Sequence, residues 1–223
     1  SQRSISGQKF RYVPEEIVHA AGMHPFRIVG RESDTPMANA YLYSNNCSFA
    51  RSCLEEGLKG NLAFMDGFVT TNSCDHIRRL YDVWARYIDT PYKKILSQPC
   101  VTTQTCINYF TEELIEFKKE LENHFQVEIS ESSLRASIKL FNHMRSLLKR
   151  IYNLRKLDPP PLSGEEVCQV VMAGMVLPKE EYISLLEALL QGLESRQYSL
   201  SNNGRPRLMV IGSELDNPAY LKL

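Results

Sequence analysis

Residues Asp66–Trp84 read DGFVTTNSCDHIRRLYDVW and decide how the rest of the chain is interpreted. Gly67–Thr71 is a short apolar run with β-type residues, and the polar pair that follows is typical of a turn. After Cys74, apolar side chains recur at three- and four-residue steps and so share one helix face: Ile77, Leu80, Tyr81 and Trp84. The stretch therefore predicts a strand, a turn and a helix, with a cysteine at the turn.

The position of Cys74 suggests chemistry. In open α/β sheets, ligands bind at the carboxyl ends of the strands. A thiol at a helix start is favoured as thiolate by the helix dipole and by basic neighbours, here Arg78 and Arg79. Cys74 thus lies where a metal-ligating or reactive thiolate is expected. The alternative is a small buried apolar cysteine, the common role of a lone Cys.

A second cysteine has a similar setting. Ser44-Asn45-Asn46-Cys47 is a capping-type cluster before a helical pattern that Gly57 and Gly60 close, with Arg51 one turn after Cys47. Two thiols at matching positions of neighbouring βα units converge above one sheet edge, provided that the two strands are adjacent. On that condition Cys47 and Cys74 predict a metal site.

The composition is that of an ordinary globular protein: 223 residues, 43% hydrophobic and 23% charged, with zero formal net charge. Zero net charge gives no support to nucleic-acid binding. No membrane span or signal peptide is found, so we expect an intracellular protein with reduced thiols. The six cysteines contain no CxxC pair, which disfavours a zinc ribbon or a thioredoxin-type site.

The fold class expected is α/β, with three parts. Residues 10–105 form a first α/β domain, with a helix over 13–22 and β-type runs at 26–29, 67–71 and 92–97. Residues 1–9 are read as a mobile start and residues 31–40 as a loop. No GxGxxG or GxxxxGK[ST] occurs, so a nucleotide-binding turn is lacking.

The pattern becomes helical over 106–200. Four apolar stripes begin near Cys106, Ser132, Ser163 and Pro178, and Ser163 with Glu166 has capping-box spacing. A linker follows at 197–205. Residues 206–223 begin with a strand and a helix cap, and we expect them to open a second α/β domain whose remainder is absent from this chain.

Four runs occur in one order: VPEEIVHAAGMHPFRI from Val13, C-x3-R with LEEGL from Cys47, CDHIRRLYD from Cys74, and RPRLMVIGSELDNPAY from Arg205. Together they resemble the (R)-2-hydroxyacyl-CoA dehydratase subunits, a family that includes ATP-dependent benzoyl-CoA reductase subunits. The resemblance covers nearly the whole chain from Phe10. It implies two Rossmann-like domains facing each other across a cleft.

The resemblance also implies a cofactor and partners. A 4Fe-4S cluster would be held by Cys47 and Cys74, with a third cysteine from the second domain, beyond Leu223. Three thiolates leave one iron open as a Lewis acid. The subunits pair as heterodimers, and an ATP-hydrolysing iron–sulfur activator delivers one electron. In the dehydratases that electron makes a ketyl radical of the acyl-CoA thioester, which loses water. Such oxygen-sensitive chemistry implies an anaerobic cytoplasm.

The remaining cysteines and histidines are given other roles. Cys53 and Cys168 are expected to pack within helices. One branch, the double-cubane reductases, uses additional cysteines, and Cys100 or Cys106 would supply them there. Packing or surface roles are expected of His19, His24 and His76, and Asp75 is read as a helix cap.

Three hypotheses stay open. The first is a radical 2-hydroxyacyl-CoA dehydratase subunit with a cluster on Cys47 and Cys74. The second is a reductase of the same fold, acting on benzoyl-CoA or carrying a double-cubane cluster. The third is a non-catalytic α/β binding module whose cysteines are structural.

Overall fold

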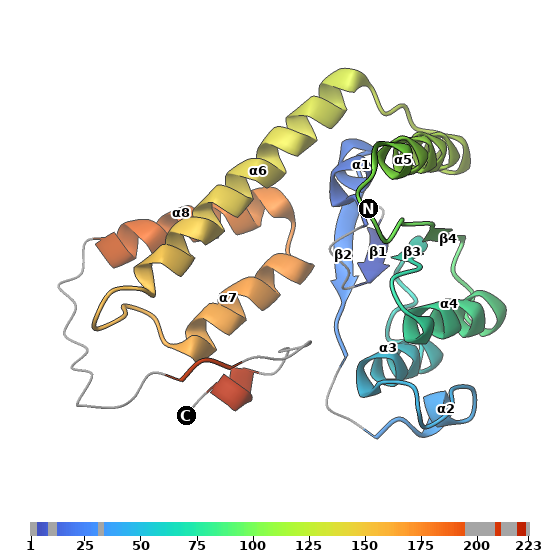
Figure 1. The fold of residues 1–223 in the computed structure, drawn as a ribbon, viewed down its shortest axis with the longest axis horizontal. Coiled ribbons are helices and arrows are strands. Elements are labelled where there is room, and N and C mark those ends of the chain that lie inside the picture. Colours follow the sequence, from blue (N-terminus) through green and yellow to red (C-terminus); the bar gives the residue numbers. More distant parts are fainter. Residues whose placement is uncertain (1–3, 9–12, 31–33, 195–207, 211–217, 222–223) are drawn as a thin grey trace. The chain divides into compact units, whose positions relative to one another are not determined.

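The chain divides into two units, Ser1–Ser137 and Ile138–Leu223. The computed structural model describes residues 4–8, 13–30, 34–194, 208–210 and 218–221 (Figure 1). No helix among these residues has the length and apolar character needed to cross a membrane.

A parallel sheet forms the centre of the first unit. Its strands are β1 (Ser4–Gln8), β2 (His24–Ile28), β3 (Gly67–Thr71) and β4 (Tyr92–Leu96), in the spatial order β2-β1-β3-β4. All three pairings are parallel. The predictions of β2, β3 and β4 are confirmed. The expectation of a mobile start over 1–9 is wrong, because residues 4–8 form an interior strand.

Helices cover both faces of this sheet (Figure 1). On one face, α1 (Glu15–Ala20) and α5 (Gln104–Phe125) share a core with Val69. On the other, α3 (Ser48–Leu58) and α4 (Asp75–Tyr87) share a core with Phe68. Successive residues of β3 thus enter opposite cores, as strand geometry requires. The α/β class is therefore confirmed.

The second core contains a close approach between α3 and α4. A side chain at Gly57 would meet the Trp84 ring at 2.7 Å, so only glycine leaves room for this indole. Gly57 lies inside α3 and does not end it, contrary to our expectation. Gly60, with a φ of 76°, follows the helix in the left-handed conformation that glycine adopts readily.

A short helix replaces part of the expected loop over 31–40. This helix, α2 (Pro36–Asn39), is held by contacts with α3. The Ala38 amide donates to Glu55 Oε2 at 2.8 Å, and Arg51 Nη1 donates to Asn39 Oδ1 at 3.0 Å. The buried Glu55 carboxylate thus binds an amide of a helix too short to be stable alone.

Polar contacts fix α5 and the turn that follows it. Glu120 accepts from Tyr92 at 3.0 Å and from Lys94 at 2.6 Å, and burial together with Glu120 raises the pKa of Tyr92. At the next turn, Glu122 Oε1 accepts from Lys118 Nζ and from the Ile129 amide, both at 2.8 Å. These two hydrogen bonds lower the pKa of the Glu122 carboxyl.

We expect Glu122→Gln to destabilise the protein at about pH 7 but much less at about pH 3. A lowered carboxyl pKa contributes stability above the ordinary pKa, and this stability is lost as the pH falls through the lowered value. The measurement is urea unfolding of both proteins at the two pH values. Glu112→Gln, at an exposed position of the same helix, is the control. If Glu122→Gln lowered the free energy of unfolding by the same amount at both pH values, the lowered pKa of Glu122 would not be the source of the stability.

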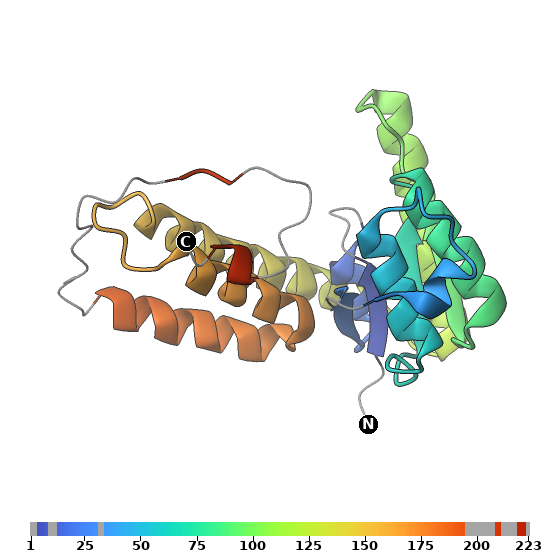
Figure 2. The ribbon, with the colours of Figure 1, turned by 90° about the horizontal axis from the view of Figure 1, so that it is seen from below.

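The second unit is helical. The helix α6 (Glu131–Leu154) includes the boundary, and α7 (Gly164–Val176) and α8 (Lys179–Glu194) pack with its later part around one core (Figure 2). The capping box of Ser163 and Glu166 is confirmed. A short 3-10 helix, η1 (Pro218–Leu221), lies against the start of α7.

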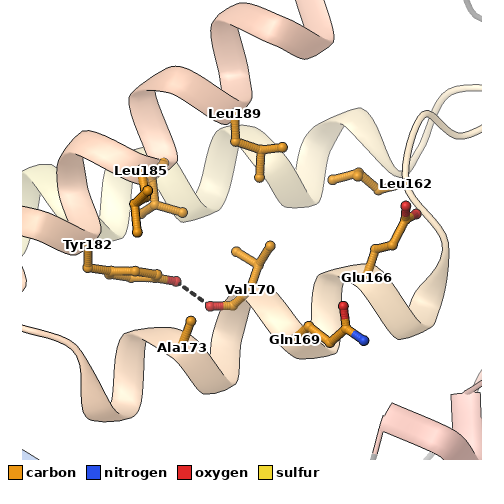
Figure 3. A pocket seen from close by; sticks show the side chains of 9 residues that line it. Leu162, Glu166, Gln169, Val170, Ala173, Tyr182, Leu185 and Leu189 are labelled. Carbon is orange, nitrogen blue, oxygen red and sulfur yellow. Dashed lines mark hydrogen bonds between the residues drawn. The ribbon is translucent and has the colours of Figure 1, made fainter.

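An apolar pocket of about 340 Å³ lies between α7 and α8 (Figure 3). Tyr182 reaches across it and donates to the Val170 carbonyl at 2.8 Å. Leu185 and Leu189 line it from the same helix as Tyr182, and Glu166 and Gln169 lie at its edge. All the lining residues belong to the second unit.

Two predictions concern parts of the chain outside the described residues. These are the linker over 197–205 and most of the segment 206–223. Leu208–Val210 are exposed and carry no regular structure. The proposal that a second α/β domain begins here stays a prediction.

Candidate metal centre

Cys47 occupies the start of α3. Its backbone is extended, and its sulfur accepts from the Ala50 amide at 3.4 Å. The thiol is exposed. It therefore lies at a helix end where backbone N–H groups without partners in the helix can donate to the sulfur.

Cys74 occupies the start of α4, three residues after the end of β3. Its backbone is extended and its side chain makes no capping hydrogen bond. The thiol is exposed. Cys74, and not Asp75, is the N-cap residue, which corrects our expectation for Asp75. The sulfur of Cys74 is thus available to a ligand.

The two cysteines reach the same region by a route that we did not foresee. The strands before them are not adjacent, because β1 lies between β2 and β3. The helices that they begin do pack side by side on one face of the sheet (Figure 1). The two helix starts are connected by His76 Nδ1 and Asn46 Oδ1, 3.3 Å apart.

The strand order places Cys74 beside a predicted ligand position. The chain runs from β1 outward to β2 and then crosses back to β3, so the order reverses between β1 and β3. Ligands of open α/β sheets bind at such a point, outside the carboxyl ends of the strands. Asn72 fixes this end of β3 to β4, since its Oδ1 accepts from the Gln98 amide at 2.8 Å.

The arginines near the cysteines have partners. Arg78 contacts Asp75 at 3.3 Å and Arg79 contacts Asp82 at 3.0 Å, both within α4. Arg51 binds Asn39, while its buried Nε has no hydrogen-bond partner among the described residues. Arg51, four residues after Cys47 in the sequence, therefore keeps one buried donor without a partner in the described part of the chain.

Two of the other four cysteines are buried within helices, as we expected. Cys53 and Cys168 are buried in α3 and α7, which confirms their packing roles. Cys100 is exposed after β4, and Cys106 lies in the first turn of α5, where Thr103 is the cap. Among the described residues, no group of three or more metal-ligating side chains is assembled.

Thiolates are the protein ligands of iron–sulfur clusters. Two exposed thiols on adjacent helix starts, at the ligand-binding edge of a parallel sheet, fit part of such a site. They cannot complete one, because no third ligand joins them in the described part of the chain. The third ligand expected beyond Leu223 stays a prediction, as does the ligand role of both thiols.

Fold and site define a parallel α/β protein with two exposed thiols, Cys47 and Cys74, at the starts of adjacent helices. Residues 11–223 match the family described as 2-hydroxyglutaryl-CoA dehydratase, D-component, and the chain belongs to this family.

Curated relatives carry names from two enzyme types. The chain is 33% identical to a subunit of benzoyl-CoA reductase of Thauera aromatica, over 93% of this chain and 54% of that protein. It is 29% identical to the beta subunit of (R)-2-hydroxyglutaryl-CoA dehydratase of Acidaminococcus fermentans, over 95% of this chain and 56% of that protein. It is 27% identical to the beta subunit of lactoyl-CoA dehydratase of Anaerotignum propionicum, over 82% of this chain and 49% of that protein. The chain thus spans about half the length of these relatives.

Proposed function

We propose that this chain is part of a subunit of an activator-dependent, radical (R)-2-hydroxyacyl-CoA dehydratase, with Cys47 and Cys74 as two ligands of a 4Fe-4S cluster. The observation that carries the proposal is the pair of exposed thiols on adjacent helix starts, in a chain of the dehydratase family. We further propose that the first unit is Rossmann-like, which its parallel order β2-β1-β3-β4 supports.

The residues of this chain would hold and orient the cluster. Cys47 and Cys74 supply thiolates, and the amide groups at the starts of α3 and α4 favour their negative charge. When bound, the cluster would supply a Lewis-acidic iron and a path for the one electron that a ketyl-radical dehydration of the thioester would require.

A second candidate is a reductase of the same family. The 33% identity to the benzoyl-CoA reductase relative favours it. A double-cubane cluster is the variant of this candidate that uses additional thiols, for which Cys100 is exposed and near the same sheet edge. The third hypothesis, a non-catalytic module, predicts that none of these thiols binds iron.

The proposal includes partners. We propose a second, homologous subunit, a separate ATP-hydrolysing iron–sulfur activator and an acyl-CoA substrate, in an anaerobic cytoplasm. The names of the relatives as subunits support the first of these. The zero net charge remains consistent with the absence of a nucleic-acid partner.

The test is an anaerobic assay of the complete natural polypeptide that contains this chain, with its partner subunit, activator, ATP and a reductant. We expect (R)-2-hydroxyacyl-CoA to lose water and give 2-enoyl-CoA, in a reaction that stops when the activator is omitted. Reduction of benzoyl-CoA with no dehydration would select the second candidate. No turnover of either thioester by iron-loaded protein would remove both.

A further inference from the structure

We propose that His76 and Asn46 are positioning residues that fix Cys47 and Cys74 relative to each other. This inference rests on the proposed function, because it gives the spacing of the two thiols a purpose. Asn46 directly precedes Cys47, and His76 follows Cys74 by two residues. Their hydrogen bond, at 3.3 Å, therefore connects the two cysteine-bearing helix starts.

The amide of Asn46 can be oriented from its contacts. Its Nδ2 donates to the Tyr43 carbonyl at 3.2 Å, and its backbone N–H donates to the same carbonyl at 2.9 Å. The side chain is buried, with only 8% of the residue exposed. With Nδ2 engaged in this way, Oδ1 is the acceptor for His76, whose Nδ1 must carry the proton.

Backbone hydrogen bonds between described residues do not connect the two cysteine-bearing turns directly. Because β1 separates β2 from β3, no hydrogen-bonded ladder joins the strands that lead to the two cysteines. Residues 29–46 separate β2 from Cys47, and Cys74 makes no capping bond that would secure its own turn. The imidazole–amide contact supplies a direct connection at this point. Metal sites need such support, because ligands must be held within about 0.5 Å of their working geometry.

The first test measures the spacing without any metal. Spin labels are placed on Cys47 and Cys74 in a chain with Cys100→Ser and Cys106→Ser, and the distribution of label distances is measured by pulsed electron resonance. We expect His76→Ala to broaden this distribution. His76→Asn should restore the narrow one, because an asparagine amide places a donor where Nδ1 was.

Matched variants separate positioning from general loss of structure. His143→Ala removes a comparable histidine contact, 2.9 Å from Glu187, in the second unit. It should leave the distribution unchanged. Circular dichroism must show the same helix content in all variants. An unchanged distribution in a folded His76→Ala chain overturns the inference.

The second test uses iron. In the complete natural polypeptide, reconstituted anaerobically, we expect His76→Ala to lose iron to a chelator about 10–100-fold faster, the usual cost of removing an outer support of a metal ligand. His76→Asn should recover most of the difference. Equal rates of iron loss, with the label distances broadened, would also overturn the cluster-positioning role.

The two tests fail in different ways. If the unaltered protein takes up no iron, the proposed function fails whatever the label distances show, and the positioning role for a cluster falls with it. If the unaltered protein holds iron and His76→Ala changes neither measurement, the proposed function stands and only this inference is lost.

Discussion

Trp84→Ala is expected to lower the free energy of unfolding by about 3–5 kcal/mol, the usual range for deleting a buried aromatic side chain. Trp84 is fully buried in α4 and stacks on Phe68 of β3, with ring centres 4.3 Å apart. Its Nε1 donates to Thr90 Oγ1 at 3.0 Å. The variant would therefore leave a cavity against Gly57 and an unpaired hydroxyl.

Chemical unfolding followed by circular dichroism measures this loss. Tyr43→Ala is the control, because Tyr43 is 86% exposed and should change stability by no more than about 0.5 kcal/mol. Trp84→Phe keeps the stacked ring but loses the indole donor. Its loss in free energy of unfolding should therefore lie between the losses of Trp84→Ala and Tyr43→Ala. A loss below about 1 kcal/mol for Trp84→Ala would contradict the packing of α3 and α4 described above.

Cys47→Ala and Cys74→Ala are each expected to remove nearly all cluster iron from the complete natural polypeptide, and with it the activity. A thiolate is lost from the cluster in both, and methyl groups supply no ligand. The brown colour and the product formed per minute are the two measurements. Cys74→Ala should keep the unfolding midpoint of the apoprotein, because its exposed thiol makes no capping hydrogen bond. Cys47→Ala should lower the midpoint slightly, because the Ala50 amide loses its sulfur acceptor.

Cys53→Ala is the matched control for this pair. It lies in the same helix as Cys47 but is fully buried. It should lose some stability through a small cavity while it keeps its iron. If Cys53→Ala lost iron and Cys74→Ala kept it, the assignment of ligands would be wrong.

The elements with strong patterns were predictable from the sequence. The stripe of α4 and the run of β3 are continuous in sequence, so their type and place followed from local periodicity. Cys47 and Cys74 could be placed at helix starts for the same reason. The packing of Cys53 inside the helix that Cys47 begins followed from its helical position, whereas the exposure of Cys47 and Cys74 did not follow from the sequence.

The elements that the sequence did not predict depend on partners distant in sequence. Ser4–Gln8 reads SISGQ, with few of the apolar β-branched residues typical of interior parallel strands. Its hydrogen bonds to β2 and β3 form it, and these cannot be read from five residues. The helix α2 likewise depends on Glu55, which lies in the next helix.

Missing β1 also changed the interpretation of the site. Without β1, the sequence pattern leaves β2 and β3 as possible neighbours, and it predicts convergence of the thiols only if their strands are adjacent. The structure brings the helix starts together through the packing of α3 on α4 and the contact of His76 with Asn46. Those two residues are 30 positions apart, and no periodic signal relates them.

The most direct test of the central claim is the amount of iron and acid-labile sulfide in the unaltered natural polypeptide that contains this chain, purified without oxygen. The account predicts about four of each per chain, as a 4Fe-4S cluster requires. About eight irons would select the double-cubane alternative. Properly folded protein with neither iron nor sulfide would contradict the account and leave an α/β binding module with two exposed thiols.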